Sequence, residues 1–202
     1  MTRTVHPIEA ESYRILRSKV DTAHLAPHSR NVAERIVHTT ADFGWLDDLV
    51  LSEEALKEAS AALAEGAPLI VDVNMVAAGV TRYPSLCLVG SAEAEGLAAT
   101  EGLTRSAAGF RLAAAEHPHD AIWVVGNAPT ALFELLRLAE TGVRPQLVIG
   151  LPVGFVGAAE SKEALRRNGL PQLSNVSAKG GSAVAAAAVN ALLYGDPLEG
   201  ES

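Results

Sequence analysis

Four short apolar runs constrain the fold of this chain more than any other feature of its sequence. Each has the length of a β-strand buried on both faces, and helical patterns of about 10 to 15 residues separate most of them. That alternation is typical of strand-helix-strand units and favours a parallel sheet. The runs are PLIVDV (68–73), SLCLV (85–89), AIWVV (121–125) and QLVIG (146–150), with a weaker fifth, QLSNV (172–176).

The sequence therefore predicts one α/β domain over residues 1–202, a three-layer sandwich with a mostly parallel sheet of about five strands. The N-terminal 65 residues hold three predicted helices and no strand, so a helical segment must lie against the sheet or over its edge. Two helices are expected at 51–66 and 127–142, each with a polar N-cap and a final glycine. These caps and glycines are Ser52, Gly66, Asn127 and Gly142.

Composition limits the classes of function. With 49% hydrophobic and 20% charged residues, the 202-residue chain can bury a core, and its net charge of −8 argues against general nucleic-acid binding. No run reaches the roughly 18 apolar residues of a membrane span, and the charged N-terminus differs from a signal peptide, so we expect a cytoplasmic protein. Cys87 is the only cysteine and is expected to be a buried, inert thiol.

Glycine-bearing turns follow three of the predicted strands. In an open α/β sheet, ligands collect beyond the carboxyl ends of the strands, where helix N-termini offer N–H groups to carboxylates or phosphates. Glycine is also a common way to turn the chain after a strand, so both alternatives stay open. The turns are Gly126 to Pro129, the segment with Gly154 and Gly157, and Lys179 to Ser182.

Familiar catalytic fingerprints are missing from the sequence. It contains neither G-x-G-x-x-G nor G-x-x-x-x-G-K-[ST], which argues against dinucleotide or nucleoside triphosphate binding by the usual devices. It also lacks H-E-x-x-H and G-x-S-x-G, so neither a metal site nor ordinary hydrolase chemistry is expected.

The segment NVAERIVHTT (31–40) combines an amphipathic helical pattern with a histidine near its end. Glu34, Arg35 and His38 fall on one flank beside the apolar stripe. That flank is compatible with solvent or with a site. A histidine in the last turn also suits the helix dipole when it is protonated.

Seven stretches resemble, in order and spacing, the precorrin-8X methylmutase family of cobalamin biosynthesis, and together they cover nearly the whole chain. They are HPIEAESYRIL (6–16), ERIVH (34–38), EGAPLIVDVNMVAAGVTR (65–82), TRSAAGFRL (104–112), VVGNAPTALFELL (124–136), LVIGLPVGFVGAAESKEAL (147–165) and KGGSAVAAAAVNAL (179–192).

The resemblance implies an isomerase that moves a methyl group from C-11 to C-12 of precorrin-8X, or of cobalt-precorrin-8, giving hydrogenobyrinate or cobyrinate. The migrating methyl is already on the substrate, so no cofactor is expected. The resemblance also implies a homodimer with the active site near the subunit contact, and a polycarboxylate tetrapyrrole as the small-molecule partner.

The same resemblance carries the active-site histidine over to His38, which would act as the general acid. An unperturbed imidazole titrates near pH ~6.5, so it can hold or release a proton at cellular pH. Guanidinium groups can grip the carboxylate arms through paired hydrogen bonds. By matching motifs, the substrate-binding candidates are Ser12, Tyr13, Arg35, Thr81, Arg82, Arg105, Asn127, Gly154 and Lys179.

The chain departs from the family's pattern in places, notably in TTADFG after His38, where members often have a glycine-containing turn. Two other functions stay open from the sequence. One is a carrier on the same scaffold that binds an unstable tetrapyrrole precursor without changing it. The other is a flavodoxin-like enzyme for a phosphorylated ligand, for which the glycine turns are the only support.

Overall fold

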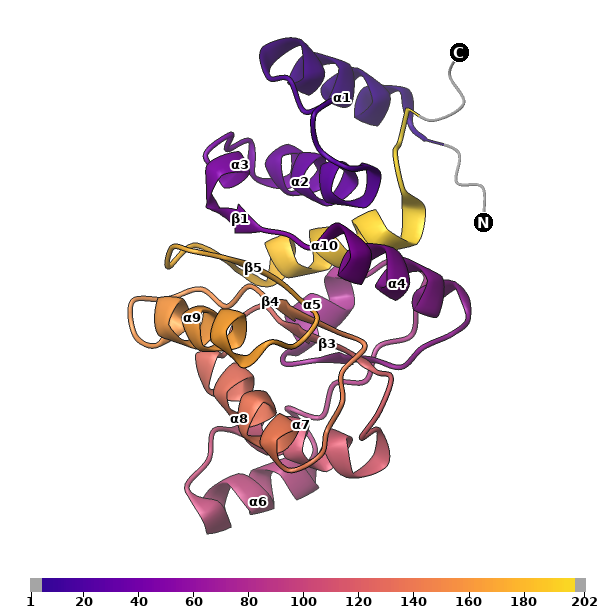
Figure 1. Ribbon diagram of the computed structural model, residues 1–202. Helices are drawn as coiled ribbons and strands as arrows, with labels where there is room; N and C mark the ends of the chain where they lie inside the picture. The colour runs from indigo at the N-terminus through magenta and orange to yellow at the C-terminus, as the bar shows by residue number, and fades with distance from the viewer. Residues whose placement is uncertain (1–4, 199–202) are drawn as a thin grey trace.

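The computed structural model describes residues 5–198, which contain a five-stranded sheet with the order β1-β5-β4-β3-β2 (Figure 1). Four strands are parallel, and a short edge strand is antiparallel to its neighbour β5. The mostly parallel sheet of five strands is therefore confirmed. The strands are β1 (Leu49–Val50), β2 (Leu69–Val71), β3 (Ile122–Val125), β4 (Leu147–Gly150) and β5 (Gln172–Asn175).

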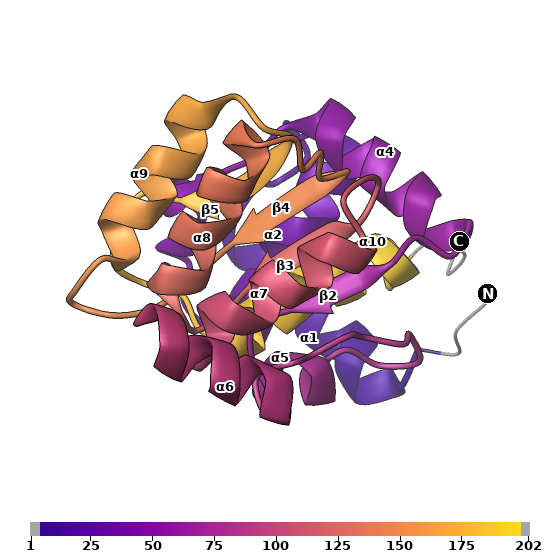
Figure 2. The same cartoon turned by 90° about the horizontal axis from the view of Figure 1, so that it is seen from below.

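Helices cover both faces of the sheet, as the sandwich predicts (Figures 1 and 2). One face carries α4 (Glu53–Ala64), α5 (Asn74–Gly79) and α10 (Ser182–Tyr194). The other carries α7 (Arg105–Glu116), α8 (Pro129–Glu140) and α9 (Ala158–Asn168).

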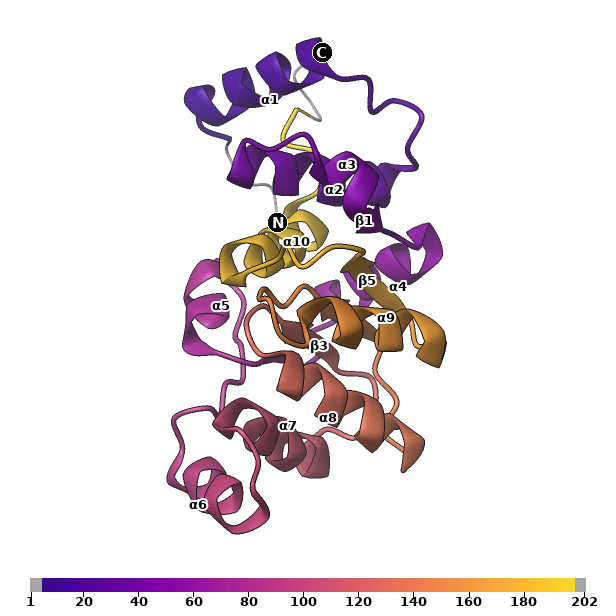
Figure 3. The same ribbon diagram turned by 90° about the vertical axis from the view of Figure 1, so that its left-hand side faces the viewer.

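Further helices extend the stack at both ends (Figure 3). Helix α2 (Pro27–Thr40) packs on α10 and beside α3 (Trp45–Asp48), and α1 (Pro7–Lys19) packs on the outer side of α2. At the opposite end, α6 (Ala92–Glu101) packs on α7. The predicted N-terminal helical segment therefore covers α10 rather than the sheet itself. No helix among residues 5–198 has both the length and the apolarity to cross a bilayer.

Alternating strand residues supply the two halves of the core, because successive side chains point to opposite faces. Val71, Val124 and Ile149 pack in the cluster that includes side chains of α2, α4 and α10. Ile70, Trp123 and Val148 pack in the cluster with side chains of α7, α8 and α9.

Two expectations about strands are wrong. The apolar run 85–89 is not a strand of the sheet; it touches edge strand β2 through a single bridge between Leu86 and Ile70. Pro84 has no N–H to donate, and the chain turns away by Gly90, which leaves only one residue paired. Conversely, the N-terminal 65 residues do hold a strand, β1, whose two residues are too few to produce a periodic pattern.

The glycines that end two predicted helices are confirmed, but one predicted cap is wrong. Gly66 and Gly142 follow α4 and α8 with φ of 91° and 121°, a conformation that favours glycine. The N-cap of α8 is Ala128 instead of Asn127. Asp72, which follows β2, does the capping: its buried carboxylate accepts the backbone N–H groups of Gly126, Asn127 and Ala128 at 3.0, 2.8 and 2.7 Å.

Candidate active site

Helix α2 carries His38, and its first turn is capped from another helix. Ala26 at the N-cap offers no side-chain acceptor. Glu53, the first residue of α4, instead accepts the backbone N–H groups of His28 at 3.0 Å and Ser29 at 2.8 Å. Partial burial alone would raise the pKa of Glu53, but these bonds outweigh it and lower the pKa to about 2. A carboxylate at a helix N-terminus also suits the dipole.

Glu34 joins α1 to α2 through a buried ionic cluster. Its carboxylate is fully buried and accepts hydrogen bonds from Arg17 Nη2 at 2.7 Å, Arg30 Nε at 2.9 Å and the Thr22 hydroxyl. Arg17 also pairs with Asp196, beyond the end of α10, at 2.8 Å. The solvent interpretation of this flank of α2 is therefore wrong at Glu34, because that side chain locks the two helices together.

His38 lies against α1 and is held in a defined orientation. Its Nδ1 is hydrogen-bonded to the Ser12 hydroxyl at 2.9 Å, and its ring stacks on Tyr13 with centroids 4.8 Å apart and planes inclined by 20°. Among the residues that the structure describes, Nε2 has no hydrogen-bond partner. When the Ser12 hydroxyl donates to Nδ1, the ring proton resides on Nε2, which leaves this atom able to exchange it.

The surroundings of His38 favour its neutral form. Partial burial is the largest effect and lowers the pKa of His38, and the nearby positive charge of Arg35 lowers it further. Glu9 acts in the opposite direction and does not outweigh them. The imidazole is therefore more acidic than an ordinary histidine when it carries its second proton.

Arg35 is buried with donors that have no acceptor. The side chain is 8% exposed, its Nε and Nη2 atoms have no hydrogen-bond partner, and Nη1 contacts Glu9 at 3.5 Å. The guanidinium lies 5.8 Å from the centre of the Tyr13 ring. Buried donors without acceptors are costly, so this arrangement favours an anion as an additional partner.

Arg35 opens onto a cleft of about 260 Å³ that contains no acidic lining residue. Since two guanidinium groups and a threonine hydroxyl face it, the cleft suits carboxylates. Its lining residues are Arg35, Thr81, Arg82, Asn190 and Tyr194. Thr81 and Arg82 come from the segment that follows α5.

The turn after β3 uses its backbone donors internally. Asp72 already occupies the N–H groups that a bound carboxylate or phosphate would need. A Cβ on Gly126 would stand 2.6 Å from Val76 and 2.9 Å from the Ser182 backbone, so this glycine is required by close packing. At this turn the structural interpretation of the glycine is the correct one, although the exposed side chain of Asn127 can still reach a ligand.

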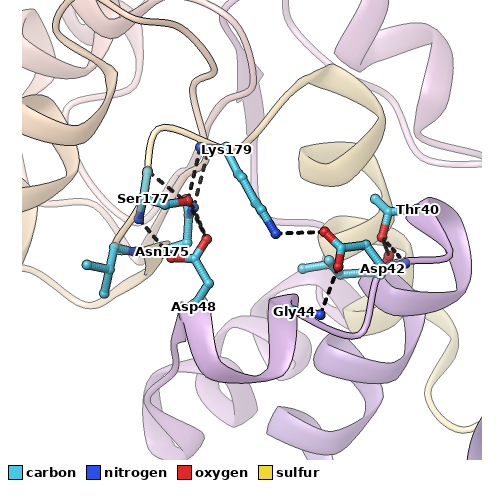
Figure 4. A network of polar contacts seen from close by, with 9 residues as sticks. Thr40, Asp42, Gly44, Asp48, Asn175, Ser177 and Lys179 are labelled. Atoms are coloured by element: carbon cyan, nitrogen blue, oxygen red, sulfur yellow. Dashed lines mark hydrogen bonds and ion pairs between the residues drawn. The ribbon is translucent and has the colours of Figure 1, made fainter.

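Lys179 connects the loop after β5 to the end of α2 (Figure 4). Its Nζ forms an ion pair with Asp42 at 2.7 Å and lies 5.6 Å from the centre of the Trp45 ring. Deeper in the network, the buried Lys162 donates to Asn175 Oδ1 at 2.7 Å and to the Lys179 carbonyl at 2.6 Å. Burial lowers the pKa of Lys162 to about 8. The loop that presents Lys179 is thus fixed from both sides.

A family model for precorrin-8X methylmutase (CbiC) matches residues 7–195 of the chain. The chain belongs to this family. It is 41% identical over 199 residues to the cobalt-precorrin-8 methylmutase of Salmonella typhimurium, covering 93% of each chain. It is 41% identical over 194 residues to the precorrin-8X methylmutase of Pseudomonas aeruginosa, covering 92% of this chain and 93% of the relative.

A solved structure agrees with the family assignment. The precorrin-8X methylmutase crystal structure from Thermus thermophilus superposes with a TM-score of 0.85 at 33% identity, covering 93% of this chain and 96% of that one. The protein is therefore an isomerase of the methylmutase family, which moves a methyl group in cobalamin biosynthesis. Both the metal-free and the cobalt-containing substrate occur in the names of its relatives.

In this methylmutase, the candidate residues fall into two groups and one outlier. Ser12, Tyr13, Arg35 and His38 are in contact, and Thr81 and Arg82 share the cleft with Arg35. Asn127, Gly154 and Lys179 lie in the loops after β3, β4 and β5, where the Gly154 N–H donates to the Ala178 carbonyl at 3.3 Å. Arg105 is exposed at the first turn of α7, on the face of the sheet opposite α2 (Figure 1).

The sequence analysis missed three residues around the site. The i,i+4 spacing of Arg30 and Glu34 was the available sign of an ion pair, but periodicity does not reveal full burial. Asn190 and Tyr194, which line the cleft, are polar residues in an otherwise apolar, alanine-rich helix. An isolated asparagine in such a helix is a usable signal for a specific hydrogen-bonding role.

Proposed function

We propose that this methylmutase moves the methyl group from C-11 to C-12 of precorrin-8X, or of cobalt-precorrin-8, with His38 as the general acid. The observation that carries the proposal is the orientation of His38: Nδ1 is held by Ser12, the ring rests on Tyr13, and Nε2 is left without a partner in the described chain. Protonating the conjugated macrocycle would draw electron density from the migration origin and lower the barrier to the shift.

The lowered pKa of His38 has a role in this mechanism. A general acid must be protonated before it can act, and in the free enzyme burial and Arg35 oppose that form. A substrate carboxylate bound to Arg35 would offset its positive charge, so substrate binding would raise the pKa of His38. The acid would then become charged mainly when a macrocycle is present.

The binding groups match a polycarboxylate substrate. Arg35 and Arg82 face the cleft with no carboxylate among its lining residues, and Thr81 adds a hydroxyl. Lys179, Asn127 and Gly154 would contact other arms of the ring from the loops at the carboxyl edge of the sheet. Arg105 stays a binding candidate only through the family motif.

We further propose that the enzyme works in the cytoplasm as a homodimer that covers the outer face of α1. Ile8 and Ile15 there are 75% and 48% exposed, and both line a cleft of about 430 Å³ that also includes Ser12. Burying such apolar side chains favours association. A second copy on this face would close the side of the site next to the Ser12 and His38 pair.

The test is turnover by the His38→Ala variant with authentic precorrin-8X, followed by the absorbance change that accompanies altered conjugation. Loss of a positioned acid lowers the rate by about 10² to 10⁴. Substrate affinity should remain within a few fold, because the carboxylate contacts are intact. His119→Ala, which changes an exposed histidine on a distant loop, is the matched control and should keep the native rate.

Turnover by His38→Ala at the native rate would exclude the acid role while leaving the methylmutase activity in place. An unchanged spectrum with the wild-type enzyme would instead favour the carrier function.

A further inference from the structure

Two side chains of α10 hold the backbone that precedes Arg82. The Asn190 amide donates from Nδ2 to the Gly79 carbonyl at 2.9 Å, and its Oδ1 accepts the Thr81 N–H at 3.1 Å. Asn190 thus bonds to backbone groups on both sides of residue 80. The close approach of the two elements allows this: a Cβ on Gly79 would stand 2.7 Å from the Ala186 Cβ.

Tyr194, one turn further along α10, completes the hold on Thr81. Its hydroxyl donates to the Thr81 carbonyl and lies 3.0 Å from the Thr81 hydroxyl. The backbone N–H, the carbonyl and the side chain of Thr81 are therefore all bound by α10. Nothing comparable is needed to close the turn after α5, because the Val80 N–H already bonds to Val76 at 3.1 Å.

The next residue, Arg82, has an unusual backbone conformation. Its φ is 59°, in the left-handed region where residues other than glycine are disfavoured. Such conformations persist only when their surroundings enforce them, and they cluster at functional sites. The Arg82 guanidinium has no ion pair among residues 5–198, and the side chain lines two adjoining clefts of about 260 and 510 Å³.

We propose that Asn190 and Tyr194 are positioning residues that hold the backbone of Thr81 and Arg82 in the conformation that presents the Arg82 guanidinium to a substrate carboxylate. Neither residue needs to touch the substrate. The inference rests on the proposed substrate-binding role of Arg82 and adds the reason that this arginine is presented in advance. Preorganisation of this kind improves binding by reducing the ordering cost.

The experiment is a double-mutant cycle between Asn190→Ala and Arg82→Ala, read as kcat and KM with precorrin-8X. A lost preorganised arginine contact corresponds to about a tenfold rise in KM. We expect that rise for Asn190→Ala, with kcat within about twofold of wild type. In the Arg82→Ala background, Asn190→Ala should add no further rise. Asn168→Ala, an exposed asparagine at the end of α9, is the matched control.

Tyr194→Phe tests the same hold if Asn190→Ala does not fold, since it removes a single oxygen from a conserved ring shape. It should raise KM by a few fold in the Arg82 background of the wild type and by nothing in Arg82→Ala. Additive effects of Asn190→Ala and Arg82→Ala, or an equal fall in kcat with unchanged KM, would overturn the positioning role. An unchanged KM for Arg82→Ala itself would overturn its premise, the binding role of Arg82.

Discussion

Replacing Glu34 by glutamine tests how α1 is held on the site. The carboxylate is 0% exposed and accepts hydrogen bonds from two guanidinium groups, so the variant removes a buried charge from between two cations. Breaking a buried ion pair typically costs about 3–5 kcal/mol. Arg17 and Arg30 are 20% and 28% exposed and can recover part of their hydration, so we expect a loss of about 2–3 kcal/mol.

The pH dependence of this loss follows from the direction of the pKa shift. Burial alone would raise the pKa of Glu34, but the hydrogen bonds from Arg17, Thr22 and Arg30 outweigh it and lower the pKa below its ordinary value. The native state therefore favours the ionised form, and its stabilising contribution is complete above a pH of about 4.5. It disappears as the pH falls through the lowered pKa, so the difference between wild type and Glu34→Gln should shrink in acid.

Urea denaturation at pH 7 and at pH 3 measures both effects. The control is Glu11→Gln, which removes the partner of Arg14 in an exposed pair 3.3 Å apart and should change the free energy of unfolding by less than about 0.5 kcal/mol. Hydrogen exchange should be faster in α1 of Glu34→Gln than in the wild type. A loss at pH 7 no larger than that of Glu11→Gln would refute the claim that this buried carboxylate docks α1.

Three further changes have defined expectations, each measured by chemical denaturation. Ala41→Gly should stabilise the protein by about 0.5–1 kcal/mol, because Ala41 ends α2 with φ of 53° and glycine adopts this conformation without a Cβ penalty. Glu53→Gln should cost about 1–2 kcal/mol at pH 7, discounted for its 30% exposure; because its pKa is lowered to about 2, the loss should fade below pH 4.5. Gly180→Ala should cost more than about 3 kcal/mol, since its Cβ would stand 2.3 Å from the Leu151 carbonyl oxygen.

Local pattern was a sound guide where a segment is buried on both sides. The strands β2, β3 and β4 consist entirely of buried residues, so their apolar runs predicted them. The run 85–89 is equally apolar, but it lies at the sheet edge after a proline and pairs at one residue only. Apolarity reports burial, and hydrogen-bond pairing depends on neighbours that the local sequence does not specify.

The candidate site illustrates the same limit for polar residues. The helical period of 31–40 put Glu34, Arg35 and His38 on one flank but could not tell solvent from interior. Which of them became buried depended on α1, whose Arg17 neutralises Glu34. The association of His38 with Ser12 came from the family resemblance, since no spacing within either helix relates residues 26 positions apart. Likewise, the use of Asp72 as an internal cap could not be read from the turn that it fills.

An acidic protein can bind a polycarboxylate because the cations that matter are those without an internal partner. The net charge of −8 describes the whole surface, and several arginines are already neutralised by neighbouring carboxylates: Arg17 and Arg30 by Glu34, and Arg111 and Arg137 by Glu134. Arg35 has two buried nitrogen atoms without acceptors, and Arg82 has no ion pair in the described chain. Both face the same cleft. Unpaired positive charge is thus concentrated next to His38, where a bound carboxylate would complete the hydrogen bonding of Arg35 and raise the pKa of the acid.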